Sequence, residues 1–211
     1  MIDPAKIHLS ELETELVNNT EWIFRKQKIT EKLYYLFGEL HTSYRQIVEI
    51  NHVELPLIFQ NRGGKISRGE NYNGLPYLML DYPAMFSKEN IFAVRTMFWW
   101  GNFFSITLHL SGKFFENKKD LAKWLVFFRE KDFAVCVNEG EWEHDFHPYN
   151  FTDIKCLDEI QIGALAKKDF FKVARRVELS KWENVAELLE QSFREIIDFI
   201  KISFPAGEKV P

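Results

Sequence analysis

The segment Ile91–Phe115 constrains the fold of this chain more than any other, because its side chains alone fix the register of a β-hairpin. A three-residue turn at 100–102 makes one face of the hairpin almost wholly apolar. A two-residue turn would instead bury Arg95 among apolar side chains, since a slip of one residue swaps the faces of a strand. We therefore predict the three-residue turn, with Asn102 in the left-handed conformation. The predicted cross-strand pairs are Phe98/Phe104, Thr96/Ile106, Val94/Leu108 and Phe92/Leu110.

The other face of the predicted hairpin is largely polar. Because successive strand residues point to opposite sides, it carries Arg95, Ser105, Thr107, His109 and Ser111, together with Ile91, Ala93, Met97, Trp99 and Phe103. The preceding segment Leu75–Tyr82 also alternates, and Pro76 and Pro83 bound it. We predict it as a third antiparallel strand that brings Tyr77 and Asp81 to the polar face.

The flanking segments predict helices at both ends of the chain, and the fold class is therefore α+β, a central antiparallel sheet (meander or hairpin 75–112) flanked by N-terminal and C-terminal helices. Four helices are expected from apolar periodicity and capping signals. One helix is the segment Asp120–Arg129, and the other three begin at the capping box Ser10/Glu13, at the cap Thr30 and at the capping box Ser180/Glu183.

Further strands are predicted at Leu57–Gln60, Phe133–Val137 and Lys172–Leu179, the last with a helix as the alternative. Together with the hairpin they give a sheet of about four to six strands. The glycine-rich stretch Asn61–Gly74 is predicted as an exposed loop. We expect a single domain over 1–211, with a helical segment 1–52, a sheet with one helix over 53–138, an irregular and strand region 139–179 and a C-terminal helix 180–204.

Composition narrows the class of partner. Aromatic residues make up 16% of the chain, with 20 Phe, 6 Trp and 7 Tyr, and suit a core or an interface. The 27 basic and 31 acidic residues are mixed along the sequence, a pattern that indicates no nucleic-acid partner. No apolar run is long enough to span a membrane and no leader is recognisable. With free thiols at Cys136 and Cys156, we expect a soluble, cytoplasmic protein.

Three regions carry residue types suited to chemistry. The polar sheet face combines an anion-binding arginine with histidine and aromatic side chains, as ligand pockets do, although the residue pattern by itself favours a solvated face. The segment Glu141–His147 contains metal-ligand types, but its spacing lacks the HExxH pattern and an acidic, solvated loop is favoured. Gly63–Ser67 lacks the spacing of a phosphate-binding loop. We predict no metal and no cofactor.

We therefore predict non-catalytic binding of a small anionic ligand or a partner protein through the polar face. The predicted ligand-binding residues are Arg95, His109, Thr107, Asp81, Tyr77 and Trp99. Arg95 is expected to anchor the anion, and Arg95→Ala to remove binding while the domain stays folded. One alternative is an enzyme with His109 as general acid/base, Asp81 as its orienter and Arg95 as anion anchor. Another is a homo-oligomeric interaction module, without nucleic-acid or membrane contacts.

Overall fold

The computed structural model describes residues 7–56, 59, 63–116 and 118–204. The chain divides into two compact units, residues 1–38 and 39–211. The smaller unit contains α1 (Glu11–Asn18) and the first part of α2 (Thr20–Ile50). The predicted capping box opens α1, since Ser10 Oγ accepts from Glu13 N–H and Glu13 Oε2 accepts from Ser10 N–H.

The second helix begins earlier than the sequence predicts. Thr30 lies inside α2, where its hydroxyl donates to the Lys26 carbonyl, so the prediction that it caps a helix is wrong. The side chain of Asn19 takes the capping position instead and accepts from Trp22 N–H at 2.9 Å. An asparagine at a helix junction can cap the following helix as well as threonine does, and the apolar pattern alone did not reveal the earlier start.

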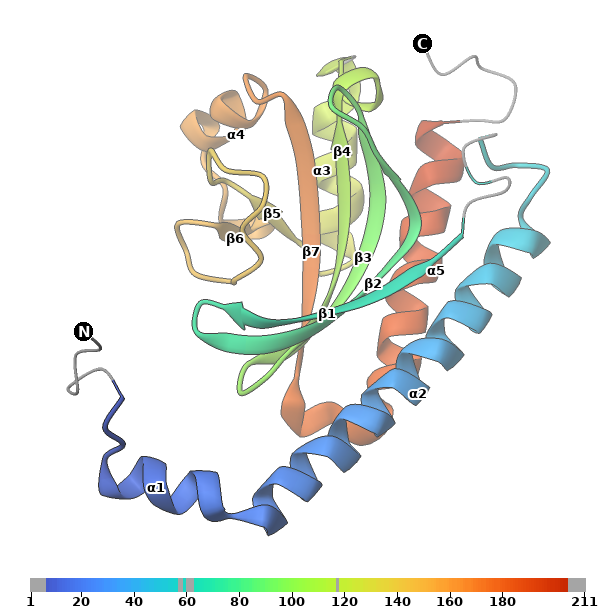
Figure 1. Cartoon of the computed structure of the whole chain (residues 1–211). Helices are drawn as coiled ribbons and strands as arrows, with labels where there is room; N and C mark the ends of the chain where they lie inside the picture. The colour runs from blue at the N-terminus through green and yellow to red at the C-terminus, as the bar shows by residue number, and fades with distance from the viewer. Residues whose placement is uncertain (1–6, 57–58, 60–62, 117, 205–211) are drawn as a thin grey trace. The chain divides into compact units, whose positions relative to one another are not determined.

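The larger unit is built on an antiparallel sheet, which has seven strands within the described residues (Figure 1). Its spatial order is β1-β2-β3-β4-β7-β5-β6. The strands are β1 (Lys65–Tyr72), β2 (Leu75–Phe86), β3 (Ile91–Trp99), β4 (Phe103–Ser111), β5 (Ala134–Cys136), β6 (Phe151–Asp153) and β7 (Phe170–Glu178). The helices of this unit, besides the end of α2, are α3 (Leu121–Glu130), α4 (Glu159–Leu165) and α5 (Val185–Ser203). Short 3-10 segments are η3 (Gly112–Phe114), η4 (Lys118–Asp120), η5 (Ile154–Cys156) and η6 (Leu179–Asn184). The predicted α+β class is confirmed.

The predicted hairpin is confirmed pair by pair in β3 and β4. Phe98 lies opposite Phe104, Thr96 opposite Ile106, Val94 opposite Leu108 and Phe92 opposite Leu110. The turn has three residues, as the face argument requires, but the left-handed residue is Gly101 with φ 71° rather than Asn102. Glycine adopts this conformation without the steric cost that asparagine incurs.

Several element boundaries differ from the predictions. Residues 65–72 of the expected exposed loop form the edge strand β1, paired with β2 from Lys65↔Asp81 onward. The strand predicted to end at Pro83 continues to Phe86 through an irregularity between Asp81 and Ala84. The 3-10 segment η6 replaces the first turn of the predicted last helix, and α5 begins at Val185. The strand predicted at 57–60 lies largely outside the described residues.

The apolar sheet face and the helices of the larger unit form its core. Side chains without exposed surface come from both α5 and the sheet. Those of α5 are Leu189, Phe193, Ile196 and Ile200, and those of the sheet are Phe104, Ile106, Leu108 and Val173. Tyr44, near the end of α2, stacks on Phe193 at 3.9 Å and hydrogen-bonds with the Thr96 hydroxyl at 3.2 Å. Within the described residues, none of the helices combines the length and apolarity needed to cross a membrane.

Candidate functional site

The polar face of the sheet is covered by residues 138–150, which make up most of the segment that connects β5 and β6. Glu141 Oε2 lies 3.0 Å from His109 Nε2, and His144 Nε2 lies 3.0 Å from Arg95 Nη1. At the centre of the segment His144 and Asp145 are buried, so the prediction of a solvated loop is wrong there. The expectation of a solvated sheet face is also wrong, because Ser105, Thr107 and His109 of β4 are each exposed by 6% or less.

Asp81 and Arg95 form a two-pronged ion pair across β2 and β3. The strand register places them directly opposite each other. Arg95 Nε–H and Nη2–H donate to the two carboxylate oxygens at 2.7 and 3.0 Å, and the side chains are only 16% and 11% exposed. A guanidinium matches a carboxylate in this geometry, and the charge of Arg95 is therefore balanced within the protein.

The two histidines of this face are electrically neutral at pH 7. Burial, together with the positive charges of Lys172 and Arg95, lowers the pKa of His109 to about 3 and lowers that of His144 well below its usual range. Burial also raises the pKa of Glu141. A guanidinium can only donate, so His144 Nε2 accepts from Arg95; an ionised Glu141 can only accept, so His109 Nε2 donates to it.

Lys172 of β7 anchors the covering segment to the sheet. Its side chain is buried, and its ammonium donates to the backbone carbonyls of Glu141 and Glu143. Burial lowers the pKa of Lys172 to about 8. The prediction did not include Lys172, although the alternation of β7 places it opposite His109 on the same face of the sheet.

Tyr72, at the end of β1, fixes the same segment from the side. Its hydroxyl accepts from the backbone N–H groups of His144 and Asp145 at 2.7 and 3.2 Å and donates to Glu143 Oε2 at 3.0 Å. Sequence reasoning missed Tyr72 because it lay in the stretch predicted as a loop. Its contacts explain why backbone groups of residues 143–145 tolerate burial.

A cavity of about 650 Å³ opens between β1, β2, β3 and the covering segment. Tyr77 lies against Gly69, where any side chain would collide with its ring. Aromatic, charged and small residues share the lining, which includes the Asp81–Arg95 pair and His144. The lining residues are Gly63, Lys65, Ser67, Tyr72, Tyr77, Met79, Asp81, Ala84, Phe86, Arg95, Trp142 and His144.

The cavity brings together three of the six predicted site residues. Arg95, Asp81 and Tyr77 line it. His109, Thr107 and Trp99 are buried on the same sheet face and do not line it. Trp99 Nε1–H donates to the Tyr72 carbonyl at 3.2 Å, and its ring packs with Met79, Met97 and Phe103.

The geometry also bears on the chemistry expected of His109. The predicted orienter, Asp81, is bonded to Arg95, while His109 is bonded to Glu141 and its ring lies 5.6 Å from that of Trp142. Among the described residues, no group of three or more histidine, cysteine or acidic side chains is arranged to hold a metal ion. Cys136 is a buried thiol that donates to Asn150 Oδ1 at 3.4 Å, and burial raises its pKa.

A second cavity, of about 730 Å³, is lined by the connection between β2 and β3, the end of β4 and the start of β7. Its lining carries charges of both signs, with the lysines 88, 118, 167 and 168 against the acids 89, 116, 139, 141 and 169. Two of these lysines are already bonded to backbone carbonyls, Lys118 to that of Lys168 and Lys168 to that of Asn138. Its charges are therefore largely matched within the protein, and we consider the first cavity the better candidate site.

Comparisons of the chain with protein-family models, with curated proteins and with solved structures find no match. A functional assignment therefore depends on the chemistry of the cavity.

Proposed function

We propose that this protein binds a small organic anion with a planar ring, without catalysing a reaction, in the cavity lined by Lys65, Tyr77, Arg95 and Trp142. The observation that carries the proposal is the cavity itself. Its volume of about 650 Å³ falls within the range of small-molecule sites, and such sites combine apolar walls with a few convergent polar groups.

The charge of the lining favours an anion. Lys65 and Arg95 are positive, Asp81 is negative and His144 is neutral, so the lining has a net charge of about +1. Because Asp81 balances Arg95, the unbalanced charge belongs to Lys65, which lies opposite Asp81 across β1 and β2. Arg95 has five N–H donors, of which three are used in the contacts described above. The remaining donors are available to a carboxylate.

The walls favour a planar ring. Tyr72 and Tyr77 lie on one side, with their ring centroids 6.3 Å apart. Phe86 and Trp142 form the rim, with ring centroids also 6.3 Å apart, and they are 44% and 52% exposed. Half-exposed aromatic rings at the mouth of a cavity gain contact area when a flat ligand enters.

We propose no catalytic role, because neither histidine of this face is placed to act as a general base. The candidate base His109 lies outside the cavity lining and is bonded to Glu141. His144 lines the cavity, but its Nε2 accepts from Arg95 and its pKa is lowered. A general base needs reach to the substrate and a pKa near the working pH, and neither histidine combines the two.

Isothermal titration calorimetry with benzoate, and with benzamide as its uncharged counterpart, tests the proposal. A ligand of this size should bind with a Kd of about 0.1–1 mM, and benzamide more weakly. Lys65→Gln should weaken benzoate binding about fivefold, which corresponds to about 1 kcal/mol for a charge at an exposed rim. Lys88→Gln, which removes an exposed lysine outside this cavity, is the matched control.

The outcomes separate the two parts of the proposal. Equal binding of benzoate and benzamide would refute the preference for an anion. Binding of neither compound, with native mass spectrometry of the purified protein showing no retained small molecule, would refute the binding function. Equal losses in Lys65→Gln and Lys88→Gln would place the anion elsewhere.

A further inference from the structure

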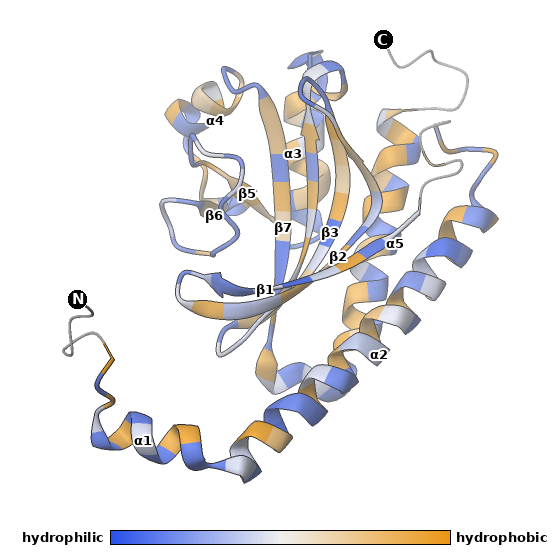
Figure 2. Cartoon of the chain, viewed as in Figure 1, coloured by the Kyte–Doolittle hydropathy of each residue, from blue (hydrophilic) through white to orange (hydrophobic). Residues whose placement is uncertain are grey.

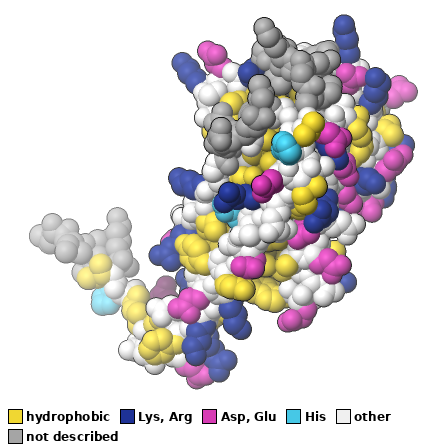
Figure 3. All heavy atoms as spheres, turned by 90° about the vertical axis from the view of Figure 1, so that its right-hand side faces the viewer, with side chains coloured by type: hydrophobic (Ala, Val, Ile, Leu, Met, Phe, Trp, Pro, Cys, Tyr) yellow, Lys and Arg dark blue, Asp and Glu magenta, His cyan; other side chains and the backbone are white. Residues whose placement is uncertain are grey.

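The N-terminal unit exposes an unusual number of apolar side chains. Among the described residues, half of the large hydrophobic residues that are exposed fall between positions 7 and 35. Hydrophobic and hydrophilic residues alternate along α1 and the first part of α2 in Figure 2. In Figure 3, hydrophobic and charged side chains lie next to each other on the surface of this unit. The exposed members are Ile7, Leu9, Leu12, Leu16, Val17, Trp22, Ile23, Phe24, Tyr34 and Tyr35.

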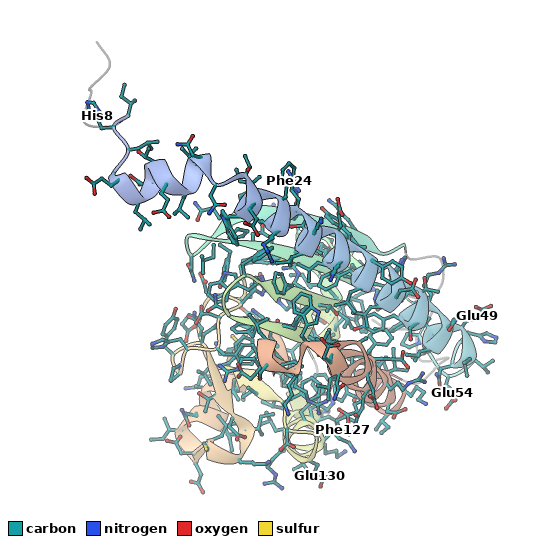
Figure 4. All side chains as sticks on the ribbon, turned by 90° about the horizontal axis from the view of Figure 1, so that it is seen from below. His8, Phe24, Glu49, Glu54, Phe127 and Glu130 are labelled. Carbon is teal, nitrogen blue, oxygen red and sulfur yellow. The ribbon has the colours of Figure 1, made fainter. Side chains whose placement is uncertain are left out.

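Helix geometry prevents one packing surface from covering the centre of this set. Trp22, Ile23 and Phe24 are consecutive in α2, and successive residues of an α-helix point about 100° apart. Trp22 and Phe24 therefore lie on nearly opposite sides of the helix; Phe24 projects outward from the ribbon in Figure 4. In α1 no residue is buried. Two short helical stretches cannot form a core of their own, and within this unit these side chains stay exposed.

The charges of this unit are separated along the chain. From position 7 to 24 there are four acidic residues and no lysine or arginine, namely Glu11, Glu13, Glu15 and Glu21. From 25 to 32 there are four basic residues and one acidic residue, namely Arg25, Lys26, Lys28 and Lys32 against Glu31. The exposed residues 22–24 lie at the boundary between the two stretches.

We propose that residues 7–35 form a docking surface for the same residues of a second copy of this chain, paired antiparallel about a two-fold axis. In that arrangement the acidic stretch of each copy meets the basic stretch of the other, and Trp22, at the boundary between the two stretches, meets its own counterpart at the centre. A two-fold interface uses the same patch on both subunits, and its strongest contacts cluster at the centre, often on tryptophan. The pairing is independent of the ligand cavity.

The charge pattern favours a second copy over a lipid surface. Helices that bind anionic membranes carry lysine and arginine along their polar face. Here Glu11 and Glu15 occupy the exposed surface of α1, and a negatively charged bilayer would repel them. A second copy supplies the opposite charge at the matching position without a change of sequence.

Sedimentation velocity and light scattering of the full chain across a dilution series test the pairing. The wild type should reach twice the 25.1 kDa of one chain. The variant Glu11→Lys/Glu15→Lys makes residues 7–35 predominantly basic, with six basic and three acidic residues. The variant Lys28→Glu/Lys32→Glu makes them predominantly acidic, with two basic and seven acidic residues. Each should weaken self-association about a hundredfold, because like charges then face each other. Mixing the two variants should restore the dimer, as should combining all four substitutions in one chain.

Glu187→Lys, a charge reversal at an exposed position of α5, is the control and should leave the dimer intact. Trp22→Ala should weaken the dimer without changing the near-ultraviolet spectrum expected of a folded sheet domain, apart from the lost tryptophan. A wild type that stays monomeric at its highest soluble concentration would overturn the proposal. So would a dimer indifferent to both charge-reversed variants, or a monomer that binds phosphatidylglycerol vesicles.

Discussion

The two faces of the central sheet are both buried, but different interactions bury them. On one face Phe104, Ile106 and Leu108 pack against α5, and the polar Thr96 is bonded to Tyr44. On the other, charged groups pair with one another beneath residues 138–150, through Arg95 with Asp81 and Lys172 with backbone carbonyls. The first face depends on shape and volume, whereas the second depends on each polar group keeping its partner.

This difference predicts how the faces respond to substitution. A packed apolar face tolerates a change of similar volume and resists a loss of volume. A buried polar face tolerates the removal of both partners better than the removal of one. The second face also borders a cavity of about 650 Å³.

The largest expected effect is a loss of volume on the apolar face. Phe104 has no exposed surface, and Phe104→Ala should lower the free energy of unfolding by about 3–5 kcal/mol. Urea denaturation measures the change. Leu108→Met, a swap of similar volume on the same strand, should cost less than about 1.5 kcal/mol. Similar costs for both variants would contradict the packing argument.

On the polar face, the removal of one ion-pair partner should cost nearly as much. Arg95→Met leaves the carboxylate of Asp81 without its counter-charge and should destabilise the protein by about 3 kcal/mol. Arg95→Met/Asp81→Asn should recover much of that loss in the same denaturation assay. Because Arg95 belongs to this buried pair, we now expect Arg95→Ala to lower the stability of the domain as well as ligand binding. Additive costs in the double variant would show that the two side chains act independently.

The pH dependence of stability should also separate the faces. The folded pKa of His109, about 3, lies below its ordinary value of 6.5, so the unfolded chain binds the extra proton first as the pH falls. Stability should therefore fall between about pH 6.5 and pH 3, by about 1.4 kcal/mol per pH unit for this one group. His109→Gln, compared with wild type in urea at about pH 7 and pH 5, should show a shallower loss. An unchanged slope would mean that His109 is accessible to protons in the folded protein.

The smallest effect on stability is expected at the cavity rim. Lys65 is exposed, so Lys65→Gln should change the free energy of unfolding by less than about 0.5 kcal/mol. The same variant should weaken benzoate binding, and the two measurements together separate binding from folding. A large loss of stability would show instead that Lys65 belongs to the structural network.

The hairpin and the residue content of its polar face could be predicted from the sequence, because alternation fixes which side chains share a face. The covering segment could not, since residues 138–150 lack periodicity and their position depends on long-range bonds to Lys172, Tyr72 and Arg95. β1 was missed for a related reason. Its residues carry little apolar pattern, and pairing with β2 overrides their weak strand preference.

The proposed binding of a small planar anion at the polar face is tested most directly by a crystal structure of the protein soaked with 4-bromobenzoate. The anomalous signal of bromine locates the ring without reference to any assumed pose. We predict a single strong peak inside the cavity, among Tyr77, Phe86 and Trp142, with the carboxylate directed toward Lys65 and Arg95. A peak in the second cavity or on the surface, with this cavity free of ligand density, would contradict the account.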